Sequence, residues 1–539
     1  MIVGNSALDV DEKRASDDRQ ARCVLAVLLI VALAVMVIVV ARADTLYDEG
    51  GYLYEGWLVV GKGWQPYADF HTKTLPLLYY IYGVVQTVAG PSVLAGRIEA
   101  AGFALAALLL MAGLARRLSG PWAAALVVGL FAFNLEAAVR YYRCFAIAPT
   151  AFFMVLSVYL VTIKRPKPWQ LYVGGLATAA ILLCRHDMIA VVVVLWVYMY
   201  LRHRRGSRGH GVAALGVSVA LPAAICVYFY ATAPAQFSNV MFMGLFTPSL
   251  EGASSYGSAV KATPQAMLWH LMMFLRWYTP SLLLLAPAVG YAVWRYRQEP
   301  KLLSEMIARH DGLALLLGLA AANYLSHLAG SVWFGLNVYY MLDFYIFLPV
   351  AGAAGASFVL AARAVKTKAA QAQLAALAVT ALVAPAWLAG VPDVIRLTGD
   401  SHLQQIATGA ETIRRLVPVD ARIFTVDDPH QFLVAQREVF PELTHQLFTY
   451  TDSTDTEAVR SRHRYNREMI AEWLSGEAQY VVVSDGLLSW MVGSDRYEDG
   501  AGLRDFMMSR IAANYTLIGT VESSYHGPTR IYKYGGRRH

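Results

Sequence analysis

The chain has 539 residues, of which 57% are hydrophobic and only 15% are charged, and its mean hydropathy is +0.43. Several apolar runs exceed the roughly 18 residues that indicate a membrane-spanning helix. This composition excludes a soluble globular protein and predicts a polytopic α-helical membrane protein. The net charge of +7 comes mostly from Lys and Arg in short loops, so it indicates membrane topology and not nucleic-acid binding.

The N-terminal end of the chain predicts a membrane anchor that is retained in the mature protein. A polar tail with several basic residues, 1–21, precedes an apolar run at about 23–41. That run is too long for a signal-peptide core and has no clear small-residue cleavage site. We therefore expect a signal-anchor helix with a cytoplasmic N-terminus.

Twelve apolar runs follow one another within 22–390, a segment that we interpret as one transmembrane domain. They lie near 23–41, 75–89, 97–115, 121–139, 145–163, 169–184, 188–201, 210–231, 279–295, 312–330, 343–362 and 371–390. Short loops rich in Lys and Arg are expected on the cytoplasmic side. If 75–89 crossed the membrane, every later basic cluster would lie opposite the basic N-terminus, so the charge pattern predicts that 75–89 does not span.

The run at 75–89 also has the composition of an interfacial helix. It is short and carries Tyr79, Tyr80 and Tyr82, and tyrosines at that density are typical of the membrane–water interface. We therefore expect about 11 transmembrane helices and an external loop, 43–96, that holds this helix. With a cytoplasmic N-terminus, an odd number of spans places the C-terminus outside.

The last part of the chain, 391–539, changes character because charged residues and turn formers return. Short β-rich runs predict strands at 423–426, 480–484, 517–521 and 530–534. Helical periodicity occurs at about 402–415 and 459–475. We expect a small external α/β domain.

With this topology, charged and aromatic residues gather on the external face. The first loop begins with the acidic motif, Asp48-Glu49-Gly50-Gly51-Tyr52, directly after the first span. The other candidate site residues on this face are Asp69, His71, Lys73, Arg140, Arg143, Arg185, His186, Asp187 and Tyr340.

The acidic motif places two carboxylates where a helix should leave the membrane. Burial raises the pKa of a carboxyl toward neutral pH, and a nearby cation keeps it ionised. Asp48 and Glu49 are therefore candidate catalytic residues, as general bases. Both also suit the start of a helix, where the dipole favours negative charge. The alternative is that one of them only caps a helix beginning at Gly50.

Three arginines lie at external span ends, where the positive-inside rule makes Arg scarce. Cations at the membrane edge are functional by default, and guanidinium groups bind phosphate through paired donors. Arg140, Arg143 and Arg185, with Lys73 from the first loop, are therefore candidate binding residues for a donor phosphate. The alternative is that these side chains extend to anionic lipid head groups.

The sequence gives little support for a cofactor or a structural metal. The four cysteines form no CxxC pair, which excludes a zinc motif and a disulfide framework. A metal site would need His71 with Asp48 or Asp69, and one histidine with scattered carboxylates is more typical of hydrogen bonding. A divalent cation is left open. The C-terminal domain has no nucleotide-binding motif, so an external active site would need a lipid-linked donor.

The first external loop resembles that of GT-C glycosyltransferases. The similarity is carried by the acidic motif and by two further segments, Gly61-Lys62-Gly63-Trp64-Gln65-Pro66-Tyr67-Ala68-Asp69-Phe70-His71 and Lys73-Thr74-Leu75-Pro76-Leu77-Leu78-Tyr79-Tyr80. It is most similar to the superfamily of dolichyl-phosphate-mannose protein mannosyltransferases and aminoarabinose lipid A transferases. These motifs cover roughly residues 44–200, while the later spans and the C-terminal domain match in layout.

This resemblance implies an inverting transferase that takes a sugar from a polyprenyl phosphate. It makes Asp48 the expected general base, with cations such as Arg143, Arg185 or Lys73 stabilising the leaving phosphate. Many members carry a second acid in the loop after the third span. Here that loop has none, and Asp187 is an open alternative. The resemblance does not specify the sugar, or whether the acceptor is a glycan, a lipid or a protein.

Two other functions are compatible with these residues. A transporter or flippase of lipid-linked sugars would also use external cations and aromatics, but it predicts charges in mid-span and a repeated half. A non-catalytic assembly subunit would use the external domain to bind a glycan. We expect an integral membrane protein among the lipids of a bacterial plasma membrane, with its active site and C-terminal domain in the periplasm.

Overall fold

The computed structural model describes most of the chain. The described residues are 5–72, 74–203, 208–243, 311–334, 346–361 and 402–536, apart from 446–448, 494–498 and 523–525, with scattered residues between 268 and 297. Lys73, Tyr340 and the predicted span at 371–390 lie outside the described residues, and the predicted span at 279–295 lies partly outside them.

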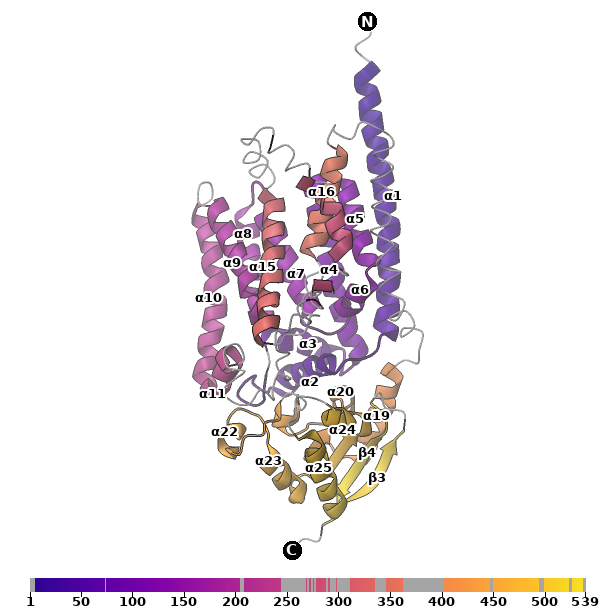
Figure 1. Cartoon of the computed structure of the whole chain (residues 1–539), viewed down its shortest axis with the longest axis vertical. Helices are drawn as coiled ribbons and strands as arrows, with labels where there is room; N and C mark the ends of the chain where they lie inside the picture. Colours follow the sequence, from indigo (N-terminus) through magenta and orange to yellow (C-terminus); the bar gives the residue numbers. More distant parts are fainter. Residues whose placement is uncertain are drawn as a thin grey trace.

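The described chain forms a bundle of apolar helices followed by a smaller α/β lobe, with the two termini at opposite ends of the molecule (Figure 1). The elements of the bundle are α1 (Asn5–Arg42), α2 (Tyr47–Lys62), α3 (Leu77–Val88), α4 (Val93–Ser119), α5 (Pro121–Ala132), α6 (Leu135–Tyr141), α7 (Ile147–Val161), α8 (Pro168–Cys184), η1 (His186–Met188), α9 (Ile189–His203), α10 (Arg208–Thr232), α11 (Pro234–Ser238), η2 (Asn239–Met243), α15 (Asp311–Phe334) and α16 (Phe347–Ala361).

Several of these helices have the length and composition of membrane spans. Among the described residues, three qualify on their own: Asp18–Arg42 in α1, Val93–Ser119 in α4 and Gly209–Thr232 in α10. The bent pair of α5 and α6 adds a fourth, and α7 and α8 are shorter apolar helices. These helices identify an integral membrane protein. The expected total of about 11 spans includes segments outside the described residues and stays a prediction.

The predicted span at 121–139 is not one straight helix. α5 ends at Ala132 and α6 begins at Leu135, with an angle of 81° between them. Asn134 starts the second helix, because its side-chain oxygen accepts a hydrogen bond from the backbone N–H of Ala137. An asparagine that caps a new helix competes with continuation of the old one, and hydropathy does not reveal this.

α2 and α3 lie across one end of the bundle (Figure 1). At this end Arg97, near the start of α4, donates hydrogen bonds to the backbone carbonyls of Ala43 and Asp44, which directly follow α1. The chain therefore leaves the bundle after α1 and re-enters it at the same end. α3 has 12 residues, or about 18 Å of helix, which is too short for the ~30 Å apolar core of a bilayer.

The basic loops meet at the other end of the bundle. Arg117 at the end of α4 donates hydrogen bonds to the carbonyl of Tyr159 and the hydroxyl of Thr162 at the end of α7. Arg202 at the end of α9 forms an ion pair with Asp311 at the start of α15. The acidic motif and these basic loops therefore lie at opposite ends of the same helices.

Glycines allow α2 and α3 to cross at close range. A Cβ atom at Gly83 would lie 2.2 Å from the backbone oxygen of Gly56. Small residues at helix contacts are typical of membrane proteins, where backbones approach closely to gain dispersion contacts. Tyr82 on α3 donates a 2.6 Å hydrogen bond to the carbonyl of Phe145, which ties this pair to the turn between α6 and α7.

The lobe, residues 402–536, is built on a four-stranded mixed sheet. Its strands are β1 (Ile423–Val426), β2 (Tyr480–Ser484), β3 (Tyr515–Val521) and β4 (Thr529–Tyr534). Their order is β1-β2-β4-β3, with β1 parallel to β2 and β4 antiparallel to both of its neighbours. All four strands lie within two residues of the predicted β-rich runs. β1 and β2 are buried apolar strands, as expected where helices cover a sheet.

Short helices surround this sheet. They are α19 (His402–Leu416), α20 (Pro429–Ala435), η5 (Pro441–Leu443), α22 (Thr456–Arg460), α23 (Arg467–Glu472), η6 (Trp473–Glu477), α24 (Asp485–Gly493) and α25 (Gly500–Asn514). The helix predicted at 459–475 is broken. His463 adopts a left-handed backbone conformation with φ of 48°, and Asn466 caps α23 by accepting a hydrogen bond from the N–H of Met469.

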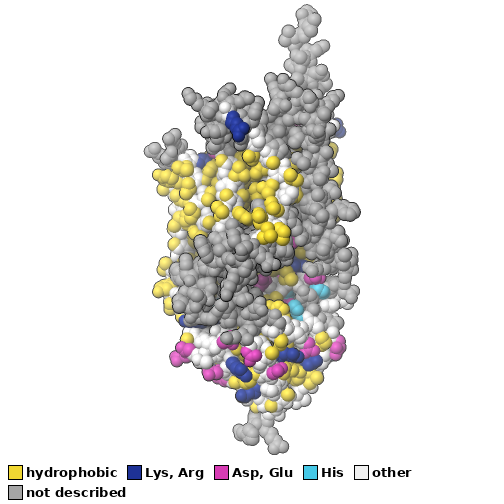
Figure 2. Space-filling model, in the orientation of Figure 1, with side chains coloured by type: hydrophobic (Ala, Val, Ile, Leu, Met, Phe, Trp, Pro, Cys, Tyr) yellow, Lys and Arg dark blue, Asp and Glu magenta, His cyan; other side chains and the backbone are white. Residues whose placement is uncertain are grey.

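Side-chain chemistry differs between the two units. On the face shown in Figure 2, the described side chains of the bundle are mostly hydrophobic, whereas acidic and basic side chains are spread over the lobe. Histidine side chains are visible at the level where the two units meet. This is also the level of α2, which carries the acidic motif.

Candidate functional site

The lobe packs directly against α2, and the glycines of the acidic motif make this possible. A Cβ atom at Gly50 would lie 2.5 Å from Nδ1 of His430, and one at Gly51 would lie 2.5 Å from Cε1 of His445. The contact is held by Tyr54, whose hydroxyl donates to the carbonyl of Arg437 at 3.0 Å. Two histidines of the lobe therefore rest on the backbone of the motif, where any larger side chain would displace them.

Both acids of the motif lie in the first turn of α2, which begins at Tyr47 rather than at Gly50. The N-cap residue is Leu46, and it makes no side-chain capping hydrogen bond among the described residues. Neither Asp48 nor Glu49 occupies the capping position, so the capping alternative has no support. Their position in the first turn is still favourable, because the helix dipole attracts negative charge there.

Glu49 is fully buried and forms an ion pair with Arg97 of α4. Nε and Nη2 of Arg97 donate to the two carboxylate oxygens, each at 2.8 Å. The backbone N–H of Cys144 donates a further hydrogen bond at 3.3 Å. Because Arg97 also binds the carbonyls that follow α1, this ion pair fastens α1, α2 and α4 together.

The charge of Glu49 is stabilised by its surroundings. Burial alone would raise the pKa of Glu49, but the charge and hydrogen bonds of Arg97, with His430 and Arg143, lower that pKa to about 2. A carboxylate with such a low pKa and with both oxygens occupied is a poor proton acceptor near neutral pH. This geometry favours a structural role for Glu49.

A chain of acids and histidines continues from Glu49 into the lobe. Nε2 of His430 lies 3.9 Å from a carboxylate oxygen of Glu49, and its Nδ1 contacts Asp428, the N-cap of α20. Asp428 also faces His526, whose Nε2 lies 3.3 Å away. Burial raises the pKa of Asp428, but the two histidines outweigh it and hold that pKa below its usual range.

The neighbouring acid, Asp427, has the opposite character. It is buried at the end of β1 and accepts a 3.0 Å hydrogen bond from the hydroxyl of Thr529. Burial, with the nearby charge of Asp428, raises the pKa of Asp427 to about 7 despite this bond and one from the N–H of Asp428. Two adjacent buried acids thus have pKa values moved in opposite directions.

Asp48 has a different environment from Glu49. Its side chain is 47% exposed, and one carboxylate oxygen lies 3.6 Å from Nε2 of His445. The other ring nitrogen of His445 lies 3.1 Å from a carboxylate oxygen of Glu55, which is two turns further along α2. Both Glu55 and His445 are buried, so Asp48 is the acid of this group that solvent reaches.

Two of the predicted cations lie near the acidic motif. Arg143 follows α6 and is 9% exposed, and its Nε has no hydrogen-bond partner among the described residues. Burial lowers the pKa of Arg143 to about 10, with smaller contributions from the charges of Arg97 and Arg140, whereas the carboxylates of Glu49 and Asp44 oppose this shift. The side chain therefore stays charged at neutral pH. Arg140 is half-buried at the end of α6.

The other predicted residues of the external turns are engaged elsewhere. Arg185 forms an ion pair with Asp187, two residues away, at the junction of α8 and η1. His186 lies beside them, and burial lowers its pKa. The guanidinium of Arg185 therefore already has a carboxylate partner, and Asp187 has a cation partner.

The remaining residues of the first loop stabilise its shape. Asp69 is exposed and accepts a 2.6 Å hydrogen bond from the backbone N–H of Gln65, which closes the turn that contains both residues. His71 is buried and hydrogen-bonded to Gln236 of α11. Among the described residues there is no group of three or more His, Cys, Asp or Glu side chains with metal-binding geometry.

Arg97, His430, His445 and Glu55 contribute to this site but were not predicted from the sequence. Their partners are remote: 48 residues separate Arg97 from Glu49, and 390 separate His445 from Glu55. Two signals could have pointed to them. Consecutive glycines beside two acids indicate close backbone packing, and Asp427-Asp428 at the end of a buried strand indicates a polar group with a function.

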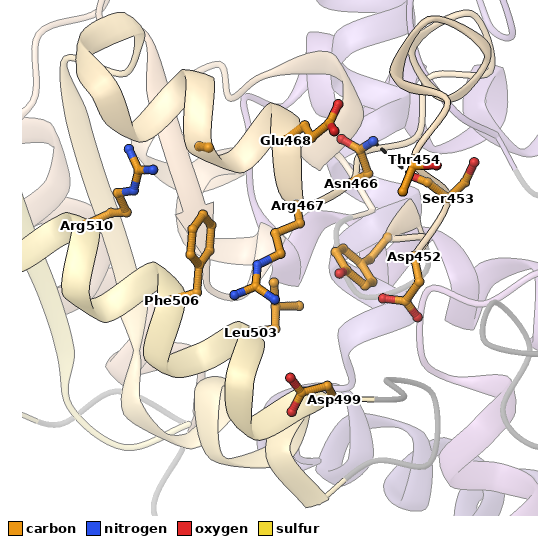
Figure 3. A pocket seen from close by; sticks show the side chains of 12 residues that line it. Asp452, Ser453, Thr454, Asn466, Arg467, Glu468, Asp499, Leu503, Phe506 and Arg510 are labelled. Carbon is orange, nitrogen blue, oxygen red and sulfur yellow. Dashed lines mark hydrogen bonds between the residues drawn. The ribbon is translucent and has the colours of Figure 1, made fainter.

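A cavity lies within the lobe (Figure 3). It has a volume of about 440 Å³, and all of its lining residues lie between Tyr450 and Arg510. The guanidinium groups of Arg467 and Arg510 lie 4.6 and 5.4 Å from the centre of the Phe506 ring. The pocket is half-open and is lined by charged and apolar side chains. Residues of α2 do not line it, so it is separate from the interface that holds the acidic motif.

Comparison with known proteins gives a fold but no sequence relative. No family model and no curated protein matches the sequence. Several solved structures match almost the whole chain. ArnT from Cupriavidus metallidurans, bound to undecaprenyl phosphate, has a TM-score of 0.57 at 13% identity and covers 95% of this chain and 98% of its own. The Archaeoglobus fulgidus oligosaccharyltransferase has a TM-score of 0.51 at 12% identity and covers 95% of this chain and 74% of its own.

Both of these structures are glycosyltransferases of the GT-C superfamily. Their similarity to this chain extends through the helical bundle and into the C-terminal part, because almost all of the chain is aligned. At 12 to 13% identity the similarity concerns architecture, and the chemistry must be argued from the residues themselves. The fold of this chain is the GT-C fold of membrane glycosyltransferases.

Proposed function

We propose that this chain is a membrane glycosyltransferase that moves a sugar from a polyprenyl-phosphate donor to an acceptor hydroxyl, with Asp48 as the general base. The observation that carries the proposal is the contrast between two adjacent acids on a GT-C fold. Glu49 is buried in an ion pair with Arg97, whereas the side chain of Asp48 is 47% exposed at the end of the bundle. The undecaprenyl phosphate bound to the similar ArnT structure supports a lipid-phosphate donor.

The proposed reaction is a single displacement. Asp48 takes the proton from the acceptor hydroxyl as the acceptor oxygen bonds to the anomeric carbon of the sugar. The bond between that carbon and the phosphate oxygen breaks, and polyprenyl phosphate leaves with the electron pair. Attack from the side opposite the phosphate inverts the configuration at the anomeric carbon.

Arg143 is the described cation best suited to stabilise the leaving phosphate. It is buried near Glu49, remains charged at neutral pH, and its Nε has no partner among the described residues. A fixed cation placed where negative charge develops lowers the barrier of such a step. Arg140 and Lys73 are further candidates for this role, whereas Arg185 is already paired with Asp187.

We place the reaction on the external face of a bacterial plasma membrane. The acidic motif and the basic loops lie at opposite ends of the bundle, and basic loops favour the cytoplasmic side. The lobe packs on α2 and would therefore be periplasmic. A donor carried by a lipid suits this location, since nucleotide sugars are not supplied there.

The test uses membranes that contain the full chain and a panel of labelled polyprenyl-phosphate sugars. We expect one donor to support transfer in the wild type, and Asp48→Asn to lower the rate by at least about 100-fold, because general base catalysis contributes that much. Donor binding should persist in Asp48→Asn, whereas Arg143→Gln should lower kcat and raise the KM for the donor, since Arg143 would contact the phosphate before and during the step. Glu411→Gln, at an exposed site on α19, is the matched control.

Two results would contradict this proposal in different ways. Full turnover in a folded Asp48→Asn variant would remove Asp48 as the base while leaving the enzyme class intact. Absence of both transfer and donor hydrolysis across the panel, with folded protein present, would favour a transporter or an assembly subunit.

A further inference from the structure

The buried histidine of the lobe that faces Asp48 occupies an unusual position. His445 follows η5, is 1% exposed, and lies against the backbone of Gly51. The ring of Tyr47 meets it edge-on, with the ring centres 5.5 Å apart. The imidazole is therefore held on several sides by α2, although it belongs to a part of the chain nearly 400 residues away.

Each ring nitrogen of His445 faces a different carboxylate of α2. Nδ1 lies 3.1 Å from Oε1 of Glu55, which is hydrogen-bonding distance, and Nε2 lies 3.6 Å from Oδ1 of Asp48. Asp48 and Glu55 are seven residues apart, which places them on one face of the helix, two turns from each other. The ring bridges these two turns.

The burial of the three side chains differs in an informative way. The side chains of His445 and Glu55 are 1% and 2% exposed, and that of Asp48 is 47% exposed. The carboxylate of Asp48 therefore reaches solvent, whereas the pair of His445 and Glu55 is buried beside it. A base held in place by a second group, itself fixed by a third, is a recurrent arrangement in enzymes.

His445 is not required simply to attach the lobe. Tyr54 of α2 donates to the carbonyl of Arg437 and accepts from the N–H of Val439, each at 3.0 Å. Lys62, at the end of the same helix, forms a 2.7 Å ion pair with Glu438. These contacts dock the same part of the lobe on α2 without involving Asp48.

We propose that His445 is a positioning residue for the general base, fixed in turn by Glu55. This inference rests on the proposed function of Asp48. In the imidazolium form both ring nitrogens donate: Nδ1–H to Glu55, and Nε2–H to one oxygen of Asp48, so that the other oxygen is presented to the acceptor hydroxyl. The separation of 3.6 Å is ~0.6 Å longer than a good hydrogen bond, and catalytic contacts commonly shorten when substrate binds.

The proposal leaves the balance of the reaction unchanged. The acceptor proton moves to Asp48, the new bond forms between the acceptor oxygen and the anomeric carbon, and the phosphate leaves with the electrons of the broken bond. His445 neither gains nor loses a proton in this step. Its contribution is to restrict the rotation of the carboxylate, and misplacement of a reacting group by about 1 Å can cost about 100-fold in rate.

The experiment is a pair of double-mutant cycles on the full-length protein, with transfer measured at saturating donor and acceptor. We expect His445→Gln to lower kcat by about 100-fold while the KM for the donor changes less than about threefold. Glu55→Gln should have a similar effect, and the double variant should be no slower than the slower single one, since both act through the same carboxylate. In the Asp48→Asn background, His445→Gln should have no further effect.

The matched control is His463→Asn. His463 is also a histidine of the lobe that contacts the first loop, through the backbone of Ala68, but it faces Asp69 and not Asp48. Asparagine suits its left-handed backbone, with φ of 48°. This variant should retain the wild-type kcat, which separates general weakening of the contact between lobe and loop from positioning of the base.

The possible results distinguish the positioning role of His445 from the proposed function of Asp48. If His445→Gln and Glu55→Gln keep the wild-type kcat while Asp48→Asn is inactive, the positioning role is wrong and the proposed function stands. Strictly additive losses in the double variant would show that His445 and Glu55 act independently, which contradicts a role of Glu55 in fixing His445. If Asp48→Asn is fully active, the proposed base itself is wrong.

Discussion

Asp48 and Glu49 are neighbours in the sequence, yet the fold gives them opposite surroundings. Successive residues on a helix point about 100° apart, so one can face the bundle while the other faces its rim. Glu49 points to Arg97 and is fully buried, whereas Asp48 points toward His445 and solvent. Two identical charges can therefore serve two purposes, one holding the helices together and one available for chemistry.

This difference predicts distinct effects of neutralising each acid. Glu49→Gln leaves Arg97 as a buried cation with a weakened partner, and removal of one member of a buried ion pair typically costs about 3–5 kcal/mol. Asp48→Asn, at a half-exposed side chain, should change the free energy of unfolding by less than ~0.5 kcal/mol. Thermal unfolding of the purified variants in detergent measures both values.

Equal stability of the two variants would show that the buried pair contributes little and would contradict the structural role of Glu49. Activity provides a second comparison. Glu49→Gln should lose turnover together with folded protein, whereas Asp48→Asn should lose turnover in protein that remains folded.

At the scale of elements, α2 is the part of the chain that all other parts of the site contact. Its glycines serve two contacts: Gly56 meets Gly83 of α3, and Gly50 and Gly51 meet the histidines of the lobe. Glycine weakens a helix by about 1 kcal/mol relative to alanine. Several glycines within one 16-residue helix therefore indicate that close packing outweighs the intrinsic preference of the backbone.

Alanine substitutions test this packing directly. In Gly51→Ala the new Cβ would lie 2.5 Å from the ring of His445, so the ring must move away from Asp48. We expect a loss of activity of at least about tenfold, although alanine is the better helix former. Gly102→Ala in α4, where a Cβ meets no atom within 4 Å, should preserve activity. The transfer assay described above makes the comparison, and an active Gly51→Ala would contradict the need for close docking.

The elements that local patterns determine are those that could be predicted from the sequence. Hydropathy predicted the apolar helices of the bundle but not α2, and short β-rich runs predicted the four strands of the lobe. The bend at Asn134 was missed because a single capping side chain causes it within an apolar run. The break before Asn466 was missed for the same reason, since periodicity continues across a residue with positive φ.

The candidate site was predicted only where its residues are close together in the sequence. The acidic motif was identified from adjacent residues, but the partners of its acids come from α4 and the lobe. No periodicity or spacing connects Glu49 to Arg97, or Glu55 to His445, because these contacts arise when separate elements pack. The number of spans and the roles of Lys73 and Tyr340 stay predictions, since they involve residues outside the described part of the chain.

At the scale of the whole molecule, the acids buried where the lobe meets α2 should make the stability of the folded protein depend on pH. The pKa of Asp427 is raised from 3.8 to about 7 by burial, so its charged form is disfavoured in the folded state. A raised folded pKa contributes stability that is fully present below the unfolded value and is lost as pH rises through the folded value. The wild type should therefore lose stability between about pH 4 and pH 7.

Asp427→Asn should remove this dependence, because the amide resembles the neutral carboxyl and has an oxygen to accept from Thr529. We expect its melting temperature in detergent to stay level between pH 5 and pH 7, where that of the wild type falls. Glu49, whose pKa is lowered to about 2, contributes in the opposite direction and only below about pH 4.5, outside this range. The same slope for both proteins would show that Asp427 is ionised at little cost in the folded state.

The docking of the lobe on α2 also has a consequence for biosynthesis. Glu55 and His445 are 390 residues apart, so at about 5–20 residues per second the ribosome completes the second about 20 to 80 s after the first. During that interval the helices that carry the acids can already be in the membrane, while the histidines that cover them have not been translated. A chain released before the lobe is translated would carry the acidic motif without His445, so on the proposed function we expect activity in the cell to require translation of the part of the message that encodes the lobe.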